Sequence, residues 1–537
     1  MTTTAAEAIE TLVARVRTEM RGGDQDARAA LAGVLEHLDV ASGHPAWADG
    51  RDVIGEAYER LVPTATRRPL GQFCTPLWAG RPMADWLMAG APDVLLDAGC
   101  GSGSLLIAAD SARGAQPTRL VGVDRDPLAL TMAATTRDLR GMRDLTLQRR
   151  DFLLDDLDVR PSAIICNPPY TRHQDLPSET KAQVHDGLID RLGLRLSRLA
   201  SLHVLFLVRA VEIAAEDARI AFLTPAQWLD TNYAQAVKKW ILERAHVEAL
   251  VTFPVEDRVF NHAVTTAGVT LIRMGAAPPG HHTRIVRLGT TKQPETELRK
   301  ALVEGGRSVT LQSNGRWSRT RTPRTSGGVA LSEVADVHRG IATGHNAFFV
   351  LSEQRRRELE LEQAHFLPCI ASPRHFSGTI LRAEDFDDMD DTVPRWLLAL
   401  DRVPNSAAMI RYLRGGREHL DVRGRTLVQQ RMKAGRRWFQ VERSIDAPIL
   451  FRYLNASPAR FVRNAAGAAP LNNWLVVQPH DGIDVDRLFG ALSKAGEHTS
   501  LREDSRHYGK GLWKLEPREL REIVLPVEAG DLVIPSR

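Results

Sequence analysis

The sequence predicts an α/β protein with a doubly wound, mostly parallel sheet, a small helical region before it and an α+β domain after it. Two observations carry this prediction. From Asp93 onward, short aliphatic runs alternate with helical stretches, which is typical of βαβ units. Before Leu61, apolar residues recur at helical spacing instead. The predicted regions are residues 1–70 (helical), 71–277 (sheet domain), 278–330 (basic connecting segment) and 331–537 (C-terminal α+β domain).

The N-terminal region is predicted to be helical from Ala5 to about Leu61, with breaks at Gly22-Gly23 and Gly43-His44-Pro45. Its first residues lack the basic, apolar and small-residue order of a secretion signal. No apolar run in the chain approaches the roughly 20 residues that span a bilayer. We therefore expect a cytoplasmic protein with no membrane partner.

Composition excludes some classes of site and leaves others open. The four cysteines contain no C-x-x-C pair and the 17 histidines form no ligand cluster, so we expect no disulfide framework and no metal site. The chain has 70 Lys and Arg against 66 Asp and Glu, a formal charge of +4. This balance permits a polyanionic partner without requiring one.

The sheet domain contains a strand that breaks into a glycine loop and then a helix. The strand ends at Asp97, and Gly99, Gly101 and Gly103 follow. Glycines allow positive φ angles and close approach of a ligand, as in Rossmann-like folds. The next predicted strand ends at Asp124, where a carboxylate can accept hydrogen bonds from ribose hydroxyls. The loop predicts a nucleotide-like ligand. NAD fits less well, because the spacing is G-x-G-x-G and because Asp97 would repel a pyrophosphate.

The fourth predicted strand leads into Asn167-Pro168-Pro169-Tyr170. An aryl amine is a poor nucleophile because its lone pair is delocalised into the ring. Two acceptors, the side-chain oxygen of Asn167 and the carbonyl of Pro168, could draw that lone pair back to the nitrogen. The prolines hold these acceptors rigidly, and Tyr170 offers a flat face for stacking a base. The interpretation that competes with this one is a simple loop turn.

Together, these motifs resemble those of the γ-class (TaqI-like, type II and IIG) N6-adenine DNA methyltransferases, and the resemblance covers most of the chain. It implies S-adenosylmethionine as cofactor and duplex DNA as substrate. Residues 71–76, which include Thr75 and Pro76, match the segment that closes over the methionine part of the cofactor. Asp97 to Gly103 look like the main cofactor motif, and Asp124 like the acid that binds the ribose.

The resemblance assigns further roles by position. Asp151 and Phe152 correspond to the contact with the adenine ring of the cofactor, and Asn167 to Tyr170 to the catalytic motif. Phe260 lies in a segment similar to the one whose phenylalanine stacks on the flipped adenine; the alternative for Phe260 is a core aromatic. The segment Val53–Leu61 looks like the helix before the catalytic domain of type I modification subunits, with Tyr58 packed in a structural role.

The C-terminal region resembles target-recognition domains more loosely, in Leu331–Val350, Asn472-Asn473 and Gly509–Pro517. A base must leave the stack before its exocyclic amine can react, so the enzyme needs a domain that grips the duplex. Two arginine-rich stretches contain Trp317 and Trp438 and are expected to supply phosphate contacts. The arginines proposed for this role are Arg316, Arg319, Arg436 and Arg437. The bland alternative for each is a solvated surface residue.

Three other functions compete with DNA methylation. Enzymes that methylate glutamine amides of release factors share the Asn-Pro-Pro-Tyr loop, although they would not need a large arginine-rich C-terminal region. A non-catalytic DNA-binding module could keep the fold, but the motifs are intact. A fused nuclease is not expected, because the segment before Gly71 is short for a nuclease domain and shows no paired-carboxylate and lysine signature. If cleavage occurs, we expect a separate restriction endonuclease partner.

Overall fold

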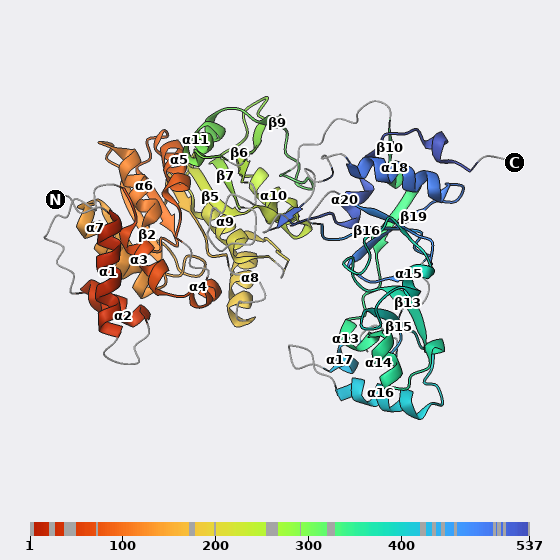
Figure 1. Ribbon diagram of the computed structural model, residues 1–537. Helices are drawn as coiled ribbons and strands as arrows, with labels where there is room; N and C mark the ends of the chain where they lie inside the picture. Colours follow the sequence, from red (N-terminus) through yellow and green to blue (C-terminus); the bar gives the residue numbers. More distant parts are fainter. Residues whose placement is uncertain are drawn as a thin grey trace. The chain divides into compact units, whose positions relative to one another are not determined.

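The computed structural model describes residues 5–20, 27–36, 50–70, 74–170, 178–197, 200–253, 267–289, 291–318, 328–418, 426–431, 437–441, 446–455, 459–497, 501, 506–508 and 512–534. The chain divides into two compact units, Met1–Arg321 and Thr322–Arg537 (Figure 1). The boundary between the two units lies inside residues 278–330, which the sequence predicts as a basic connecting segment.

A sheet forms the centre of the first unit, and its described strands follow the order β3-β2-β1-β4-β5-β7-β6-β8-β9. Strands β3 to β5 pair in parallel, whereas β7 lies antiparallel between β5 and β6. From the central strand β1 the chain adds β2 and β3 on one side, and then returns to add β4 and β5 on the other side. This order confirms the doubly wound sheet. The strands are β1 Val94–Ala98, β2 Arg119–Asp124, β3 Leu145–Arg149, β4 Ala163–Cys166, β5 Arg219–Pro225, β6 Ala245–Thr252, β7 Ala267–Met274, β8 Thr283–Arg287 and β9 Arg307–Val309.

Helices cover both faces of this sheet (Figure 1). Neighbouring residues of a strand face opposite sides, so Leu95 packs among α5, α6 and α11, and Leu96 among α8, α9 and α10. Both leucines are fully buried. The helices are α5 Leu77–Met88, α6 Ser104–Arg113, α7 Pro127–Arg140, α8 Ser178–Leu192, α9 Leu202–Ile213, α10 Gln235–Leu242 and α11 Pro294–Val303, with the 3-10 turns η4 Ala226–Asp230 and η5 Asn232–Ala234.

The N-terminal part of the first unit is helical, with α1 Ala5–Met20, α2 Ala27–Glu36, α3 Val53–Leu61 and α4 Thr64–Leu70. Helices α1 to α3 share one apolar core with α7, to which α7 contributes Leu128, Ala129 and Met132. The side chain of Asp52 caps α3 by accepting the N–H of Gly55 at 2.8 Å. The helical region is therefore packed against the sheet domain.

The structure differs from the expectation for 278–330 as a connecting segment. Strand β8 pairs in parallel with β6, β9 pairs with β8, and α11 packs against α5. The apolar signal that marks these elements is weak, because β8 buries only alternate residues such as Ile285 and β9 is largely exposed. The first unit thus extends through Trp317, whose side chain is fully buried.

The second unit is α+β and its described strands form two main sheets. A five-stranded sheet has the order β11-β19-β16-β17-β14, and a four-stranded sheet has the order β12-β15-β13-β18. The strands are β10 Val329–Ala330, β11 Ala335–Arg339, β12 Val350–Ser352, β13 Phe366–Ile370, β14 Ile380–Leu381, β15 Pro394–Leu398, β16 Ile449–Arg452, β17 Phe461–Asn464, β18 Ala469–Pro470, β19 Trp474–Pro479, β20 Arg506–Tyr508, β21 Leu512–Lys514 and β22 Val524–Leu525.

Each sheet of the second unit has its own core. Helix α18 buries Leu488 and Leu492 against β11, β16 and β19, and β10 pairs with β22 beside them. Around the smaller sheet, Phe349, Leu397 and Met409 are fully buried. The helices are α12 Leu331–Val334, α13 Asn346–Phe349, α14 Glu353–Glu358, α15 Glu384–Asp387, α16 Ala407–Glu418, α17 Leu427–Arg431, α18 Val485–Glu497 and α20 Pro517–Arg521, with the 3-10 turns η6 Gln363–His365 and η8 Ala529–Leu532.

Candidate cofactor and substrate site

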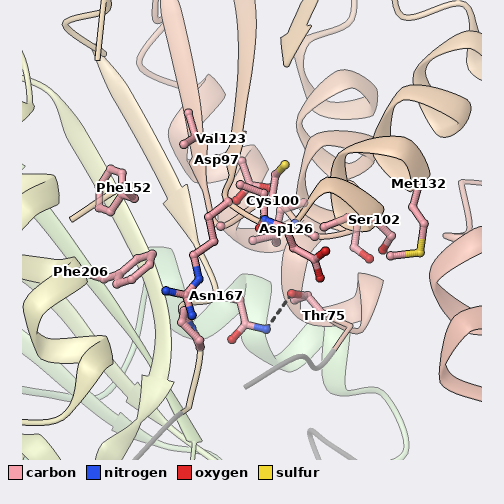
Figure 2. Close-up of a pocket in the computed structure, with 18 of the residues that line it drawn as sticks. Thr75, Asp97, Cys100, Ser102, Val123, Asp126, Met132, Phe152, Asn167 and Phe206 are labelled. Carbon is pink, nitrogen blue, oxygen red and sulfur yellow. Dashed lines mark hydrogen bonds between the residues drawn. The ribbon is translucent and has the colours of Figure 1, made fainter. Parts of the chain in front are cut away.

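A cavity of about 500 Å³ lies at the carboxyl ends of β1, β2 and β4, where ligands of open α/β sheets bind. Figure 2 shows the side chains that surround it. The predicted site residues in its lining are Thr75, Asp97, Gly99, Gly101, Asp124, Asp151, Phe152, Asn167 and Pro169. Pro76, Gly103, Pro168 and Tyr170 belong to the adjoining elements and are not among the residues that line it.

The glycine loop connects β1 to α6 and has the conformation that its sequence predicts. Gly101 has a φ of 57° and Gly103, the N-cap of α6, has a φ of 95°. Such angles favour glycine over residues with a Cβ. The loop is fixed to the neighbouring strand, because Gly99 donates its N–H to the carbonyl of Val123 at 2.8 Å.

Asp124 ends β2 and is held by backbone donors. Its carboxylate accepts the N–H of Gly101 at 3.0 Å and the N–H of Asp126 at 2.9 Å. Burial raises the pKa of Asp124 above its ordinary value. Each carboxylate oxygen has a second lone pair, so Asp124 can still accept hydrogen bonds from ligand hydroxyls.

Asp97 is the least satisfied polar group of the cavity. Its side chain is only 1% exposed, and among the described residues neither carboxylate oxygen has a hydrogen-bond partner. Burial, and to a lesser degree the charge of Asp124, raise the pKa of Asp97 well above its usual range. A buried carboxylate without partners costs free energy, so the site is suited to a ligand that brings a cation or hydrogen-bond donors to Asp97.

Aromatic side chains form another part of the lining. The ring of Phe152 lies 5.0 Å from the ring of Phe206 on α9, with planes 36° apart. In Figure 2 these rings lie on the side of the pocket away from Met132 and Ser102. Asp151 precedes Phe152 in the turn after β3, and its carboxylate accepts the backbone N–H of Leu153 at 3.0 Å. This end of the cavity can take a flat apolar ring.

Asn167 follows β4 directly and is oriented by Thr75. The amide nitrogen Nδ2 donates to the hydroxyl of Thr75 at 3.0 Å (Figure 2). Because the amide oxygen and nitrogen point in different directions from Cγ, this bond turns Oδ1 away from Thr75. Thr75 itself precedes Pro76, the N-cap of α5, whose carbonyl accepts the backbone N–H groups of Ala79 and Gly80 in the first turn of the helix. A residue predicted for the cofactor thus also positions the predicted catalytic amide.

Tyr170 is fixed at the edge of the site by β5. Its hydroxyl donates to the carbonyl of Leu223 at 3.1 Å, and its ring meets that of His203 at 6.5 Å, with an interplanar angle of 73°. Burial raises the pKa of Tyr170 and lowers that of His203 to about 3, so both groups are neutral near pH 7. The face of Tyr170 therefore has a defined orientation.

Two lining residues from the N-terminal helices escape sequence reasoning. Arg28 on α2 and Tyr58 on α3 both line the cavity. The sequence predicts a packed structural role for Tyr58. Tyr58 is indeed buried, but it also lines the cavity. No sequence pattern around Arg28 predicts that this residue lines the cavity. Asp126 also lines the cavity. Its sequence signal is local, because an aspartate directly before a proline is typical of a helix N-cap.

The residues expected to contact DNA are only partly described. Phe260, Arg319 and Arg436 lie outside the described residues. Arg316 is partly buried in the first unit and Arg437 is exposed in the second. The two tryptophans between the arginines are core residues, which corrects the expectation of an interleaved surface. Trp317 packs against Trp228 at 5.7 Å, and Trp438 packs against Phe348 at 5.7 Å.

Among the described residues, no group of three or more His, Cys, Asp or Glu side chains is placed to hold a metal ion. In the same part of the chain, every helix is too short or too polar to cross a membrane.

The chain is similar to known DNA methyltransferases. Residues 49–301 match the N-6 DNA Methylase family, and residues 318–533 match the C-terminal domain of type II methyltransferase M.Eco57I. Type II methyltransferase M.XamI of Xanthomonas campestris pv. amaranthicola is 27% identical over 487 residues, 86% of each chain. M.AccI of Acinetobacter calcoaceticus is 22% identical over 481 residues, 87% of each chain.

A solved structure shares the fold. The type IIL restriction-modification enzyme MmeI, determined in complex with DNA, matches 88% of this chain and 70% of its own at 13% identity and a TM-score of 0.56. The family matches cover both units of this chain. Residues 49–301 therefore resemble an N-6 DNA methylase domain, and residues 318–533 resemble the C-terminal domain of type II methyltransferase M.Eco57I.

Proposed function

We propose that this protein is an S-adenosylmethionine-dependent, site-specific DNA methyltransferase that modifies the N6 amine of adenine. The observation that carries the proposal is the Asn167-Thr75 hydrogen bond beside the cavity of about 500 Å³. It holds a carboxamide at the carboxyl end of β4, next to a site suited to a nucleoside-like ligand. The matches to type II methyltransferases along most of the chain support DNA as the substrate.

The cavity residues fit S-adenosylmethionine. Asp97 has a carboxylate in need of donors or a cation, and the cofactor carries both an ammonium group and a sulfonium. Asp124 would accept from the ribose hydroxyls, and Phe152 and Phe206 would flank the adenine ring. When bound, the cofactor supplies an electrophilic methyl group, whose C–S bond breaks as the bond to the attacking nitrogen forms, leaving a neutral thioether.

The motif residues prepare the amine. Oδ1 of Asn167 and the carbonyl of Pro168 would accept the two N–H groups of the base, which localises the lone pair on nitrogen. Tyr170 would stack on the base, its ring already fixed through Leu223. One N–H proton passes to solvent after transfer. Removing the Oδ1 acceptor should therefore slow methyl transfer more than it weakens cofactor binding.

We further propose that the second unit recognises the target sequence. The MmeI neighbour with the same fold was solved bound to DNA, and recognition requires a domain that grips the duplex around a flipped base. Arg316, Arg319, Arg436 and Arg437 stay predicted phosphate contacts, and Phe260 a predicted stacking residue. A separate restriction endonuclease as partner fits the match to enzymes named as type II methyltransferases.

The test is methyl transfer from labelled S-adenosylmethionine to mixed-sequence duplex DNA, followed by digestion to nucleosides. We expect label in N6-methyladenosine with the native protein and a loss of at least about a hundred-fold with Asn167→Ala, since removal of one preorganised hydrogen-bonding group from an active site costs about 2.7–4 kcal/mol. Arg60→Ala, on the exposed side of α3, is the matched control and should retain activity. Label in cytosine would refute the adenine assignment, and label only in added release factor would favour the glutamine alternative.

A further inference from the structure

Three side chains from distant parts of the chain meet on one wall of the cavity. Arg28 on α2 donates from Nη1 to the hydroxyl of Tyr58 at 2.5 Å and from Nη2 to the carboxylate of Asp126 at 2.7 Å. All three side chains line the cavity. The N-terminal helices therefore supply part of its wall as well as packing behind it.

Asp126 connects Arg28 to the turn that presents Asp124. One oxygen of Asp126 caps α7 by accepting the N–H of Leu128 at 3.1 Å, and the other accepts from Arg28. The backbone N–H of Asp126 donates to the carboxylate of Asp124 at 2.9 Å. Arg28 thus holds the residue whose backbone in turn holds Asp124.

Apolar and polar contacts reinforce this connection. Ala129 and Met132 of α7 pack in the same core as α1 to α3, and they also line the cavity. At the start of α3, Asp52 accepts hydrogen bonds from the hydroxyls of Ser102 and Ser104, next to the glycine loop. The docking surface for the N-terminal helices and the cavity wall are therefore built from the same elements.

We propose that the N-terminal helical region is an integral part of the cofactor site, with Arg28 as a positioning residue for Asp124. It follows that cofactor binding and docking of α1 and α2 stabilise one another, since coupling between two sites is reciprocal. This inference rests on the proposed S-adenosylmethionine site.

The structure also provides a matched control. The Arg28-Asp126 pair is shielded, with side chains 20% and 18% exposed, whereas the Arg60-Glu10 pair that joins α3 to α1 has side chains 43% and 68% exposed. Exposed pairs contribute little to stability because solvent screens them. Both arginines bridge helices of the same region, but only Arg28 lines the cavity.

The first measurement is calorimetric binding of S-adenosylhomocysteine to the full chain. We expect Kd to rise about ten-fold in Arg28→Ala and in Asp126→Asn, since a charge-assisted hydrogen bond is lost in each. The asparagine still caps α7, so this variant tests the pairing with the helix intact. The double variant should be little weaker than either single one, because the two changes remove the same interaction. Arg60→Ala should change Kd less than two-fold.

The second measurement is hydrogen exchange of α1 and α2 with and without S-adenosylhomocysteine. Ligand should slow exchange in these helices in the native protein and in Arg60→Ala, and should not in Arg28→Ala. If Arg28→Ala fails to fold, Asp126→Asn decides the question. Failure of the native protein to bind would refute the proposed cofactor. Binding by the native protein with the same Kd in both variants, or with unchanged exchange in α1 and α2, would refute the coupling alone.

Discussion

The amide nitrogen of Asn167 donates a hydrogen bond to the hydroxyl of Thr75, 92 positions earlier in the chain. This contact joins the segment before α5 to the end of β4. It fixes which side of the carboxamide presents nitrogen and which presents oxygen. Under the proposed function, Thr75 would therefore affect the chemistry without being an acceptor for the base.

Replacing Thr75 tests this orientation. Thr75→Val keeps the branched shape and removes the hydroxyl, so we expect kcat for methyl transfer to fall by up to about ten-fold, the net value of one hydrogen bond. Thr75→Ser retains the hydroxyl and should keep most of the native rate. Single-turnover rates at saturating cofactor give the measurement. Equal rates for the valine and serine variants would show that the contact does not orient Asn167.

Asp97→Asn should stabilise the unliganded protein while weakening cofactor binding. The folded-state pKa of Asp97 is raised, so the cost of its charge is absent well below pH 4 and grows as pH rises. We expect the variant to gain about 1–3 kcal/mol in free energy of unfolding at pH 7, the cost of an unsatisfied buried group.

Denaturant unfolding at several pH values and calorimetric cofactor titration measure the two effects of Asp97→Asn. The gain in stability should disappear as the pH falls to about 4, because the carboxyl of the unfolded chain then binds the proton that the folded carboxyl, with its raised pKa, already holds. Arg60→Ala serves as control for a change in net charge. A variant that is less stable than the native protein at pH 7 would contradict the interpretation of Asp97 as an unpaired carboxylate.

Two variants of Tyr170 distinguish the contribution of its aromatic ring from that of its hydroxyl group. Tyr170→Ala removes the aromatic face, and kcat/KM for DNA should fall by roughly 5- to 150-fold, since stacking a base on an aromatic ring is worth about 1–3 kcal/mol. Tyr170→Phe keeps the aromatic face, loses the hydroxyl that donates to Leu223, and should retain most of the activity. Initial rates at varied DNA concentration test both. A phenylalanine variant as impaired as the alanine variant would assign Tyr170 a role through its hydroxyl.

Lys238 makes stability depend on pH in the alkaline range. Burial lowers its pKa to about 8, while its ammonium donates to the carbonyl of Gly315 at 2.9 Å. Between about pH 8 and 10.5 the unfolded chain binds a proton that the folded one lacks, so the free energy of unfolding should rise with pH. Lys238→Met should abolish this rise.

The comparison for Lys238 is the difference in unfolding free energy between native protein and Lys238→Met at each pH, which removes contributions from other titrating groups. Lys239→Met, at an exposed neighbouring position, is the matched control and should follow the native pH dependence. Parallel curves for native protein and Lys238→Met would refute the lowered pKa.

The sequence predicts the parts of this molecule that rest on local patterns. The sequence predicts the buried runs of β1, β2 and β4, the glycine loop and the position of Asn167 after a strand, because apolar periodicity and turn chemistry are local signals. The loop residues reach the cavity because the carboxyl ends of parallel strands share one edge of the sheet.

The sequence does not predict contacts made by long-range packing. Arg28 reaches Asp126 only after α2 docks on α7, and no local pattern encodes that distance. The sequence places Trp317 among arginines expected at the surface. In the structure its ring packs against Trp228 and Lys238. Composition cannot distinguish an aromatic ring that meets a base from one that fills a core.

Strand β10, near the start of the second unit, pairs antiparallel with β22 near its end, with Val329 opposite Leu525. The first and the last of the described strands of this unit are therefore hydrogen-bonded to each other. A domain whose two ends lie together in this way can be replaced as a whole with little disturbance to its neighbours, as inserted and permuted domains are. Under the proposed division of labour, exchanging the second unit as a whole would direct the same methylation chemistry to a different DNA sequence.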